Sequence, residues 1–331
     1  MKLADDALLI NQRHRATAVH GGRSSGARHV VVLMAVYNGS AFLQAQLESL
    51  AAQLHEDWSL IVSDDGSTDD SLNVIEAFAR THPERRVSVL QGPGKGFAQN
   101  FLALIRAADP DAPFVAFCDQ DDVWLPDKLS RALERIGDDA RPTLYGARTE
   151  VVSREGETLG CSPLFARSPA FANSLVQSIA GGNTMVLNRA GLNLLQRAAQ
   201  EPVPVISHDW WAYQIVSGAG GHVDYDPEPG VQYRQHDGNL VGSNHGIAAR
   251  LLRLRRLLSG EMRDWTDANL QALRAADALL TSENRAVLAR FAELRRAGPL
   301  GRLRGVQRLG LYRQTRMGQV ALILAAVLRK I

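Results

Sequence analysis

Apolar and polar positions follow two alternating patterns along the first part of the chain. Short runs of β-branched and other apolar residues are typical of parallel strands that are covered on both faces. These runs lie at 30–37, 58–64, 87–91 and 113–118. The segments between them carry apolar residues at helical spacing, namely 40–54, 69–82 and 96–108. The pattern therefore predicts an α/β fold with a doubly wound, mostly parallel sheet.

The pattern changes after Asp138. Short strands at 142–147 and 221–234 predict a smaller half with a mixed sheet, which completes the domain. Beyond Asn244, Leu, Ala and Arg recur at helical spacing. We therefore expect three parts: a tail that is disordered, a large domain and a helical, basic C-terminal region. Their bounds are 1–29, 30–244 and 245–331.

Composition places the chain among globular proteins. Of its 331 residues, 45% are hydrophobic and 22% are charged, and the net charge of +2 gives no indication of a nucleic-acid partner. Cys118 and Cys161 lack CxxC spacing and form no disulfide framework, which favours a reducing compartment and a cytoplasmic location. Residues 1–29 lack the apolar segment of a secretory signal.

Charge is unevenly distributed at the C-terminus. From Arg285 to the end there are eleven basic residues and one acidic residue, Glu293. The apolar run 320–328 is too short for the roughly 20 residues that span a bilayer. One interpretation is a helical bundle with Arg on its wet face. The other, which we favour, is peripheral contact with the inner face of the cytoplasmic membrane, with this run partly inserted. The basic residues expected at the headgroups are Arg302, Arg304, Arg308, Arg313 and Arg316.

Carboxylates follow two of the predicted strands. Asp64 and Asp65 end the second strand, and Asp119, Asp121 and Asp122 follow the fourth. Crowded like charges cost energy unless a cation lies among them, and oxygen ligands suit Mg2+ or Mn2+. An ordinary capped turn before a helix explains the same residues without a metal. In doubly wound sheets, ligands bind beyond the carboxyl ends of the strands, where these acids fall.

Four motifs in order carry a resemblance to a known family. They are "VLMAVYNGSAFLQAQLESLAAQ", "LIVSDDGSTDDS", "GPGKGFAQN" and "FCDQDDVWLPDKL". Together they resemble the family 2 glycosyltransferases of GT-A fold, in particular bacterial rhamnosyltransferase-like members. The resemblance is dense from about 30 to 136 and thinner to about 245. It implies inverting, metal-dependent transfer of a sugar, such as rhamnose from dTDP-rhamnose, to a hydroxyl of a bacterial cell-surface glycan or a lipid-linked glycan.

The resemblance also implies a set of residues that bind the donor, a dTDP- or UDP-sugar. Tyr37 would stack on the pyrimidine base, and Asp65 would accept the ring N–H. Lys95 and Asn100 fall in the segment that the family places near the donor, and Arg234 falls near the diphosphate.

The same resemblance implies a metal site for Mg2+ or Mn2+. Asp119 and Asp121 match the DxD motif, with Asp121 as the direct ligand and Asp119 also near the ribose. His236, in the loop after the last strand, matches the third ligand.

On the acceptor side, Asp209 matches the general base of the family. His208 stands where many members carry Glu, which leaves the role of that neighbour open. From the residues alone, Asp209 is also a helix N-terminal acid. Trp210 and Trp211 are expected to line the acceptor cleft, and Gly182 matches a glycine loop where donor and acceptor sugars approach the backbone.

Two alternatives remain at this stage. A nucleotidyltransferase of sugar metabolism also uses acidic metal sites on an α/β sheet, but it releases pyrophosphate. Such enzymes commonly carry a glycine-rich phosphate loop after the first strand, and "YNGSAF" is not one. The other alternative is an inactive protein that binds a nucleotide or a glycan as an assembly partner.

Overall fold

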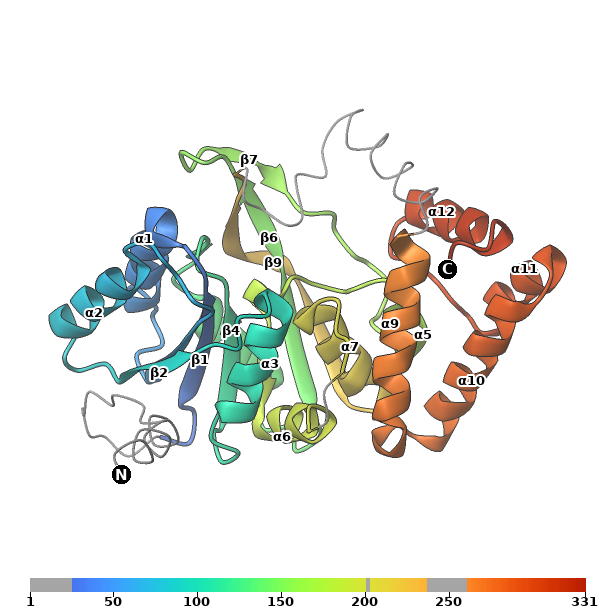
Figure 1. Cartoon of the computed structure of the whole chain (residues 1–331), viewed down its shortest axis with the longest axis horizontal. Helices are drawn as coiled ribbons and strands as arrows, with labels where there is room; N and C mark the ends of the chain where they lie inside the picture. Colours follow the sequence, from blue (N-terminus) through green and yellow to red (C-terminus); the bar gives the residue numbers. More distant parts are fainter. Residues whose placement is uncertain (1–25, 201–202, 237–260) are drawn as a thin grey trace, which may run out of the picture.

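The computed structural model describes residues 26–200, 203–236 and 261–331, and within them it forms a nine-stranded sheet covered by helices (Figure 1). The strand order is β3-β2-β1-β4-β8-β6-β9-β5, and β7 pairs with β6. Most of the predicted tail, and the boundary predicted near 245, lie outside the described residues.

The first half of the sheet is parallel, as predicted. Its strands are β1 (Val30–Val36), β2 (Trp58–Asp64), β3 (Val87–Gln91) and β4 (Phe114–Cys118). Its connecting helices are α1 (Ser40–Ala51), α2 (Ser71–Thr81) and α3 (Phe97–Ala107). The observed bounds agree with the sequence pattern to within a few residues.

The second half of the sheet is mixed, also as predicted. β6 (Thr143–Val152) lies antiparallel to β8 (Val186–Asn188) and parallel to β9 (His222–Arg234). β8 joins the two halves by pairing antiparallel with β4. Two short strands, β5 (Val123–Trp124) and β7 (Thr158–Cys161), pair antiparallel with β9 and β6. Strands as short as β5 are not evident in the sequence because two residues establish no periodicity.

The sheet carries a hydrophobic core on each face. Val31 and Leu33 of β1 belong to one core, and Val30 and Val32 to the other, as the period of two in a strand requires. The first core includes residues of α3, α6 and α7; the second includes residues of α1, α2 and α4. Four further helices contribute to these cores: α4 (Lys128–Ile136), α5 (Phe171–Ser174), α6 (Arg189–Ala198) and α7 (His208–Gly218).

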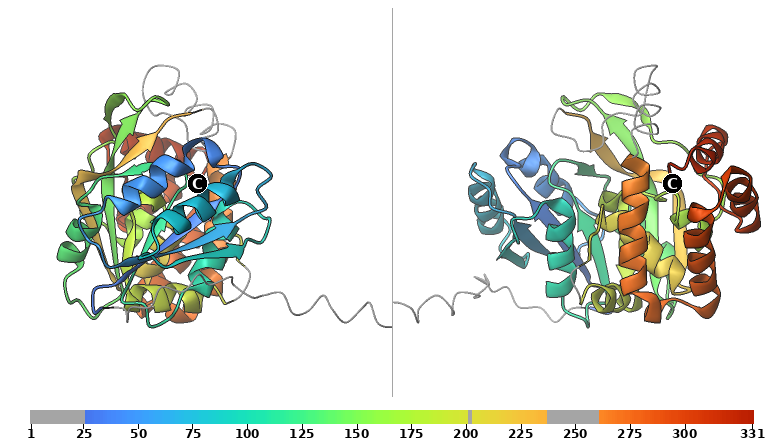
Figure 2. Two further views of the ribbon diagram at one scale, coloured as in Figure 1. Left: turned by 90° about the vertical axis from the view of Figure 1, so that its left-hand side faces the viewer. Right: turned by 45° about the vertical axis from the view of Figure 1, so that its right-hand side comes forward.

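The C-terminal helices pack against the sheet region and share its core. They are α9 (Glu261–Ala275), α10 (Ser282–Arg296), α11 (Pro299–Arg308) and α12 (Arg316–Val327). Leu273, Phe291 and Leu322 are buried in the same core as Val31. α9 lies between the sheet region and the other three helices (Figure 2). None of the helices in the described ranges is long and apolar enough to cross a membrane.

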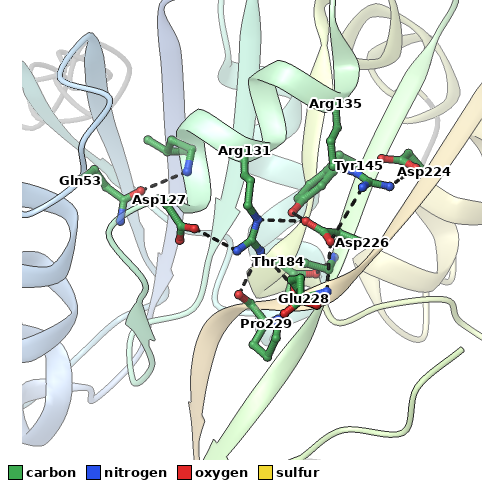
Figure 3. Close-up of polar contacts among 12 residues, drawn as sticks. Gln53, Asp127, Arg131, Arg135, Tyr145, Thr184, Asp224, Asp226, Glu228 and Pro229 are labelled. Carbon is green, nitrogen blue, oxygen red and sulfur yellow. Dashed lines mark hydrogen bonds and ion pairs between the residues drawn. The ribbon is translucent and has the colours of Figure 1, made fainter.

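A polar network ties β9 to α4 (Figure 3). The buried Asp226 carboxylate accepts hydrogen bonds from the Tyr145 hydroxyl (2.8 Å) and from Nε of Arg131 (3.0 Å). Arg135 pairs with Asp224 at 2.6 Å in a more exposed position. The network lies next to an irregularity in the pairing of β6 with β9. It therefore fixes β9 where the strand register shifts, and the far end of β9 enters the candidate site.

Candidate active site

The end of β1 is held by the acidic motif that follows β4. The Tyr37 ring is 57% exposed, whereas its backbone is fixed by Gln120. The Tyr37 N–H donates to Oε1 of Gln120 (2.8 Å), and Nε2 of Gln120 donates to the Tyr37 carbonyl (3.0 Å). A Cβ at Gly39 would lie 2.4 Å from the same Oε1, so glycine is needed there. No motif or spacing indicated this role for Gln120.

The turns after β1 and β2 are bonded to each other. The Asn38 side chain accepts the N–H of Thr68 (2.8 Å). Asp69 accepts the N–H of Ser40 (2.9 Å) and the hydroxyl of Ser71 (2.5 Å). Although partial burial opposes it, these hydrogen bonds lower the pKa of Asp69 to about 2. Asp69 is therefore a charged side chain that connects the turn after β1 to the turn after β2. It lies just before α2, but it does more than begin that helix.

Asp65 anchors the loop 92–96, which carries Lys95. Its two oxygens accept the N–H groups of Gly94 and Gly96, each at 2.7 Å. Both glycines have positive φ (65° and 84°), a region that other residues rarely adopt. Lys95 is exposed between them. An ionised carboxylate has about four acceptor positions, so the predicted contact of Asp65 with a base N–H is compatible with this arrangement.

Asn100 has a different role from the one predicted. It is 1% exposed, and both ends of its amide are used by Ser63. Nδ2 donates to the Ser63 carbonyl (2.8 Å), and Oδ1 accepts the Ser63 hydroxyl (2.5 Å). A Cβ at Gly92 would lie 2.7 Å from Oδ1 of Asn100. Asn100 therefore holds the end of β2 and lies beside Gly92, and its buried amide offers no exposed group for the predicted donor contact.

Two of the three predicted metal ligands meet directly. Nε2 of His236 lies 2.9 Å from Oδ2 of Asp121. Asp119 is half-buried, and burial together with the charges of Asp122, Asp121 and Asp209 raises its pKa well above the usual range. In the part of the chain that the structure describes, no three His, Cys, Asp or Glu side chains converge as metal ligands.

Asp122, which no motif assignment singled out, is the structural member of the acidic motif. It is 1% exposed. Its Oδ2 accepts Nδ2 of Asn183 (2.5 Å), and its Oδ1 accepts the N–H of Arg234 (3.2 Å). Burial and the nearby charge of Asp121 raise the pKa of Asp122 to about 7. Asp122 thus joins the glycine loop at 181–183 to the end of β9.

Phe42 of α1 lies close to several basic groups, beside the predicted metal ligand His236. The Phe42 ring stacks on His236, with ring centroids 4.7 Å apart. The guanidinium groups of Arg234 and Arg154 lie 5.2 Å and 5.5 Å from the Phe42 centroid. Arg234 also donates from Nη1 to the Arg154 carbonyl (2.7 Å). Phe42 and Arg154 were not predicted, because they come from different parts of the sequence and match no motif.

The candidate base lies at the start of α7. The Oδ1 of Asp209 accepts the N–H of Trp210 (2.7 Å), in the first turn of the helix, where the backbone dipole favours a negative charge. The charge of Asp209 contributes to the raised pKa of Asp119. The predicted base and the predicted metal ligands are therefore within electrostatic range of one another.

His208 is a buried aromatic side chain. It is 3% exposed and stacks on Phe101, with centroids 3.7 Å apart, and the edge of Phe117 approaches at 5.1 Å. Burial lowers the pKa of His208 to about 4, so the ring is neutral. A Cβ at Gly182 would lie 2.2 Å from Nε2 of His208. Gly182 is needed to accommodate the His208 ring, and the predicted approach of sugars to this glycine is not what requires it.

Comparison with known proteins decides the family. The model of "Glycosyl transferase family 2" matches residues 31–183, which include the ends of β1 and β2, the acidic motif after β4 and the loop 181–183. The chain contains a family 2 glycosyltransferase domain. The nucleotidyltransferase alternative is therefore excluded, and the assignment is to a class of enzymes rather than of inert binding partners.

One curated relative matches most of the glycosyltransferase. The dTDP-rhamnosyl transferase RfbG of Shigella flexneri is 29% identical over 231 residues, which cover 67% of this chain and 78% of that protein.

Solved structures confirm the GT-A fold. A mannosyltransferase from Pyrobaculum calidifontis, PcManGT, in complex with GDP-Man and Mn2+, superposes with a TM-score of 0.50 at 17% identity, covering 91% of this chain and 86% of that one. S. aureus TarS, in complex with UDP-GlcNAc, gives a TM-score of 0.51 at 18% identity, covering 79% of this chain and 86% of that one.

The two adjacent tryptophans at the start of α7 have separate roles. Trp211 is 1% exposed in the core, so its predicted place in an acceptor cleft is wrong. Trp210 is half-buried next to Asp209, and its Nε1 donates to the Ser174 carbonyl (2.6 Å). Its ring meets the edge of Trp265 on α9, with centroids 6.5 Å apart. Of the two, only Trp210 remains a candidate for contact with the acceptor.

Proposed function

We propose that this glycosyltransferase transfers rhamnose from dTDP-rhamnose to a hydroxyl of a bacterial cell-surface glycan or lipid-linked glycan, with inversion at the anomeric carbon and with Mg2+ or Mn2+ as cofactor. The observation that carries the proposal is that the loop 181–183 joins the two sides of the site: Asn183 bonds to Asp122 of the acidic motif, and Gly182 lies against His208, the neighbour of Asp209. A base and a donor-binding acid are needed on the two sides of one sugar.

The donor half of the proposal rests on the groups at the ends of β1, β2 and β9. The exposed ring of Tyr37 is available to stack on a pyrimidine base. Arg234 and Arg154, beside Phe42, supply positive charge for the diphosphate. The choice of dTDP-rhamnose follows the dTDP-rhamnosyl transferase relative.

The chemical types of the three predicted ligands suit a divalent ion, although within the described residues only Asp121 and His236 meet. Asp119 and Asp121 offer carboxylate oxygens and His236 offers an imidazole nitrogen, a set that suits Mn2+ or Mg2+. Burial, and after it the nearby carboxylates Asp122 and Asp121, raise the pKa of Asp119, and a bound cation would favour its ionised form. A divalent ion held there would stabilise the negative charge of the leaving nucleoside diphosphate. The Mn2+ complex of the P. calidifontis structure supports the same cofactor class.

The acceptor half rests on Asp209. Its Oδ1 is engaged by the Trp210 N–H, which leaves Oδ2 to receive the acceptor proton. As the proton passes to Asp209, the acceptor oxygen bonds to the anomeric carbon, and the bond from that carbon to the phosphate oxygen breaks on the opposite face. One displacement with one base gives the inverted product.

A donor panel tests the reaction class. Purified protein is incubated with dTDP-, UDP- and GDP-sugars, with Mn2+ or Mg2+ or with EDTA, and release of nucleoside diphosphate is measured. We expect metal-dependent release of dTDP from dTDP-rhamnose. Absence of binding and turnover with every donor would refute the proposal.

The base is tested by Asp209→Asn. Asn keeps an oxygen for the Trp210 N–H but cannot accept the proton, so we expect transfer to fall by roughly 10²- to 10⁴-fold with donor affinity unchanged. Asp70→Asn, an exposed acid at the start of α2, is the matched control and should transfer normally. Near-normal turnover in Asp209→Asn would remove Asp209 from this role.

A further inference from the structure

Helix α12 presents an apolar side to solvent. Its large exposed side chains are Met317 (77%), Val320 (53%), Leu324 (49%) and, directly after the helix, Leu328 (51%). They recur every three or four residues and therefore lie on one side of the helix. On the opposite side, Leu322, Ala325 and Ala326 are buried and attach α12 to the core. A contiguous exposed apolar surface of this kind marks a site of interaction.

The adjacent helix adds an exposed apolar side chain and exposed positive charge. α11 packs against α12, and Leu300 at its start is 69% exposed. Arg304 and Arg308, one turn apart on α11, are exposed, as is Arg316 at the start of α12. We call the exposed side chains Leu300, Arg304, Arg308, Arg316, Met317, Val320, Leu324 and Leu328 the α11–α12 face. From Arg285 to the end, all residues of which are described, eleven basic residues face a single acidic one.

The predicted contact of Arg302 with lipid headgroups is wrong. This side chain instead connects α11 to α12. Arg302 is 6% exposed, and its Nη2 donates to the carbonyl of Val327 (3.0 Å). It satisfies the C-terminal end of α12, where carbonyl groups lack helical partners. The α11–α12 face is therefore a fixed surface of the fold.

We propose that the α11–α12 face docks on an anionic lipid bilayer. In this arrangement α12 lies along the membrane surface, its four apolar side chains enter the boundary of the acyl chains, and the arginines meet the headgroup phosphates. An amphipathic helix with a basic border is the expected chemistry for such binding. Each arginine near an anionic surface adds to the attraction, and a positive face with few acids is complementary to it.

A second copy of this chain is a poorer occupant. A two-fold symmetric contact places each patch against its own equivalent. Here that would bring Arg304, Arg308 and Arg316 toward the same cations of the partner, with Glu293 as the one acid in this part of the chain. Like charges in an interface cost energy, whereas an anionic bilayer neutralises them.

The position of the α11–α12 face suggests where the acceptor comes from. This point rests on the proposed sugar-transfer reaction. α12 lies at the level where β6 and β9 end, the side of the sheet that carries the candidate active site (Figure 1). Contacts also connect the two regions: Nδ2 of Asn173 donates to the Tyr312 carbonyl (2.8 Å), and Nε1 of Trp210 donates to the Ser174 carbonyl (2.6 Å). A protein docked in this way would receive its acceptor from the lipid surface.

Vesicle binding of the full chain tests the docking itself, independently of sugar transfer. Sedimentation is measured with vesicles of phosphatidylcholine alone and with added phosphatidylglycerol, at low and high salt. We expect binding to the anionic vesicles that weakens with salt. The double variant Met317→Gln/Leu324→Gln should lower the partition coefficient by roughly tenfold or more. Arg304→Gln/Arg308→Gln should lower it by roughly 25-fold, at roughly fivefold for each arginine.

Matched controls lie on the far side of the molecule. Leu54 is 70% exposed after α1, and Arg86 is exposed before β3. Leu54→Gln and Arg86→Gln should bind as the unaltered protein does, and all variants should share its melting temperature. Three results would overturn the proposal: no binding to anionic vesicles, equal binding to neutral ones, or a dimer in solution that Met317→Gln/Leu324→Gln converts to a monomer.

Discussion

Replacing Gly182 with Ala tests how closely the loop 181–183 packs against His208. The added Cβ would lie 2.2 Å from Nε2 and 2.7 Å from Cε1 of His208, well inside the roughly 3.5–4.0 Å of a normal contact. The imidazole has little room to withdraw, because it stacks on Phe101 and meets the edge of Phe117. The loop must therefore move instead.

The expected cost is that of overpacking a core, about 1–3 kcal/mol in the free energy of unfolding. For a chain of this size each kcal/mol lowers the melting temperature by about 1–2 °C. The moving loop carries Asn183, whose bond to Asp122 is 2.5 Å long. Because Asp122 also holds the Arg234 backbone, we expect transfer to fall, by up to roughly a hundredfold for a shift near 1 Å.

A double-mutant cycle in urea separates the clash from other effects. His208→Ala removes the atoms that the new methyl group would meet, so Gly182→Ala should cost less than about 0.5 kcal/mol in that background. Gly298→Ala is the control, since no atom lies within 4 Å of its Cβ position and the residue precedes α11. Because Gly298 is the N-cap of α11, where Ala is less favourable than Gly, this substitution should cost up to about 1 kcal/mol, and equally with and without His208. An equal cost of Gly182→Ala with and without His208, or no cost at all, would refute the steric explanation.

Two further predictions concern buried charge. Burial lowers the pKa of His208 from 6.5 to about 4 in the folded protein. Between these pH values the unfolded chain therefore binds one more proton than the folded chain. The stability due to the neutral ring is present above pH 6.5 and is lost as the pH falls toward 4. This adds a slope of up to about 1.4 kcal/mol per pH unit, which should vanish in His208→Gln when unfolding is followed from about pH 7 to about pH 5; an unchanged slope would contradict the assignment. Asp226→Ala leaves Arg131 and Tyr145 without their buried partner and should cost about 3–5 kcal/mol, measured by urea denaturation. Asp224→Ala, which breaks a more exposed ion pair, should cost about 0–1 kcal/mol, and similar losses in both variants would be inconsistent with the burial argument.

The fold was predictable because it is encoded locally. Apolar runs of strand length, separated by helical spacing, required a parallel sheet, and the observed β1 to β4 confirm it. The acids at the strand ends were identifiable for the same reason: their position depends only on where a strand stops. Short strands such as β5 escaped prediction, since their conformation depends on pairing with β9, a segment about 110 residues away.

What the sequence by itself determined was the order of the elements, the sugar-transfer motifs and the excess of basic residues at the C-terminus. Only the tertiary structure decided which side chains face the crevice. Asn100 and Trp211 match the expected positions in the chain but are buried in the core, whereas Phe42 and Arg154 match no motif and lie beside His236 and Arg234. The physical reason is that residue type and spacing fix local conformation, while burial and partnership arise from contacts between segments that are remote in the chain.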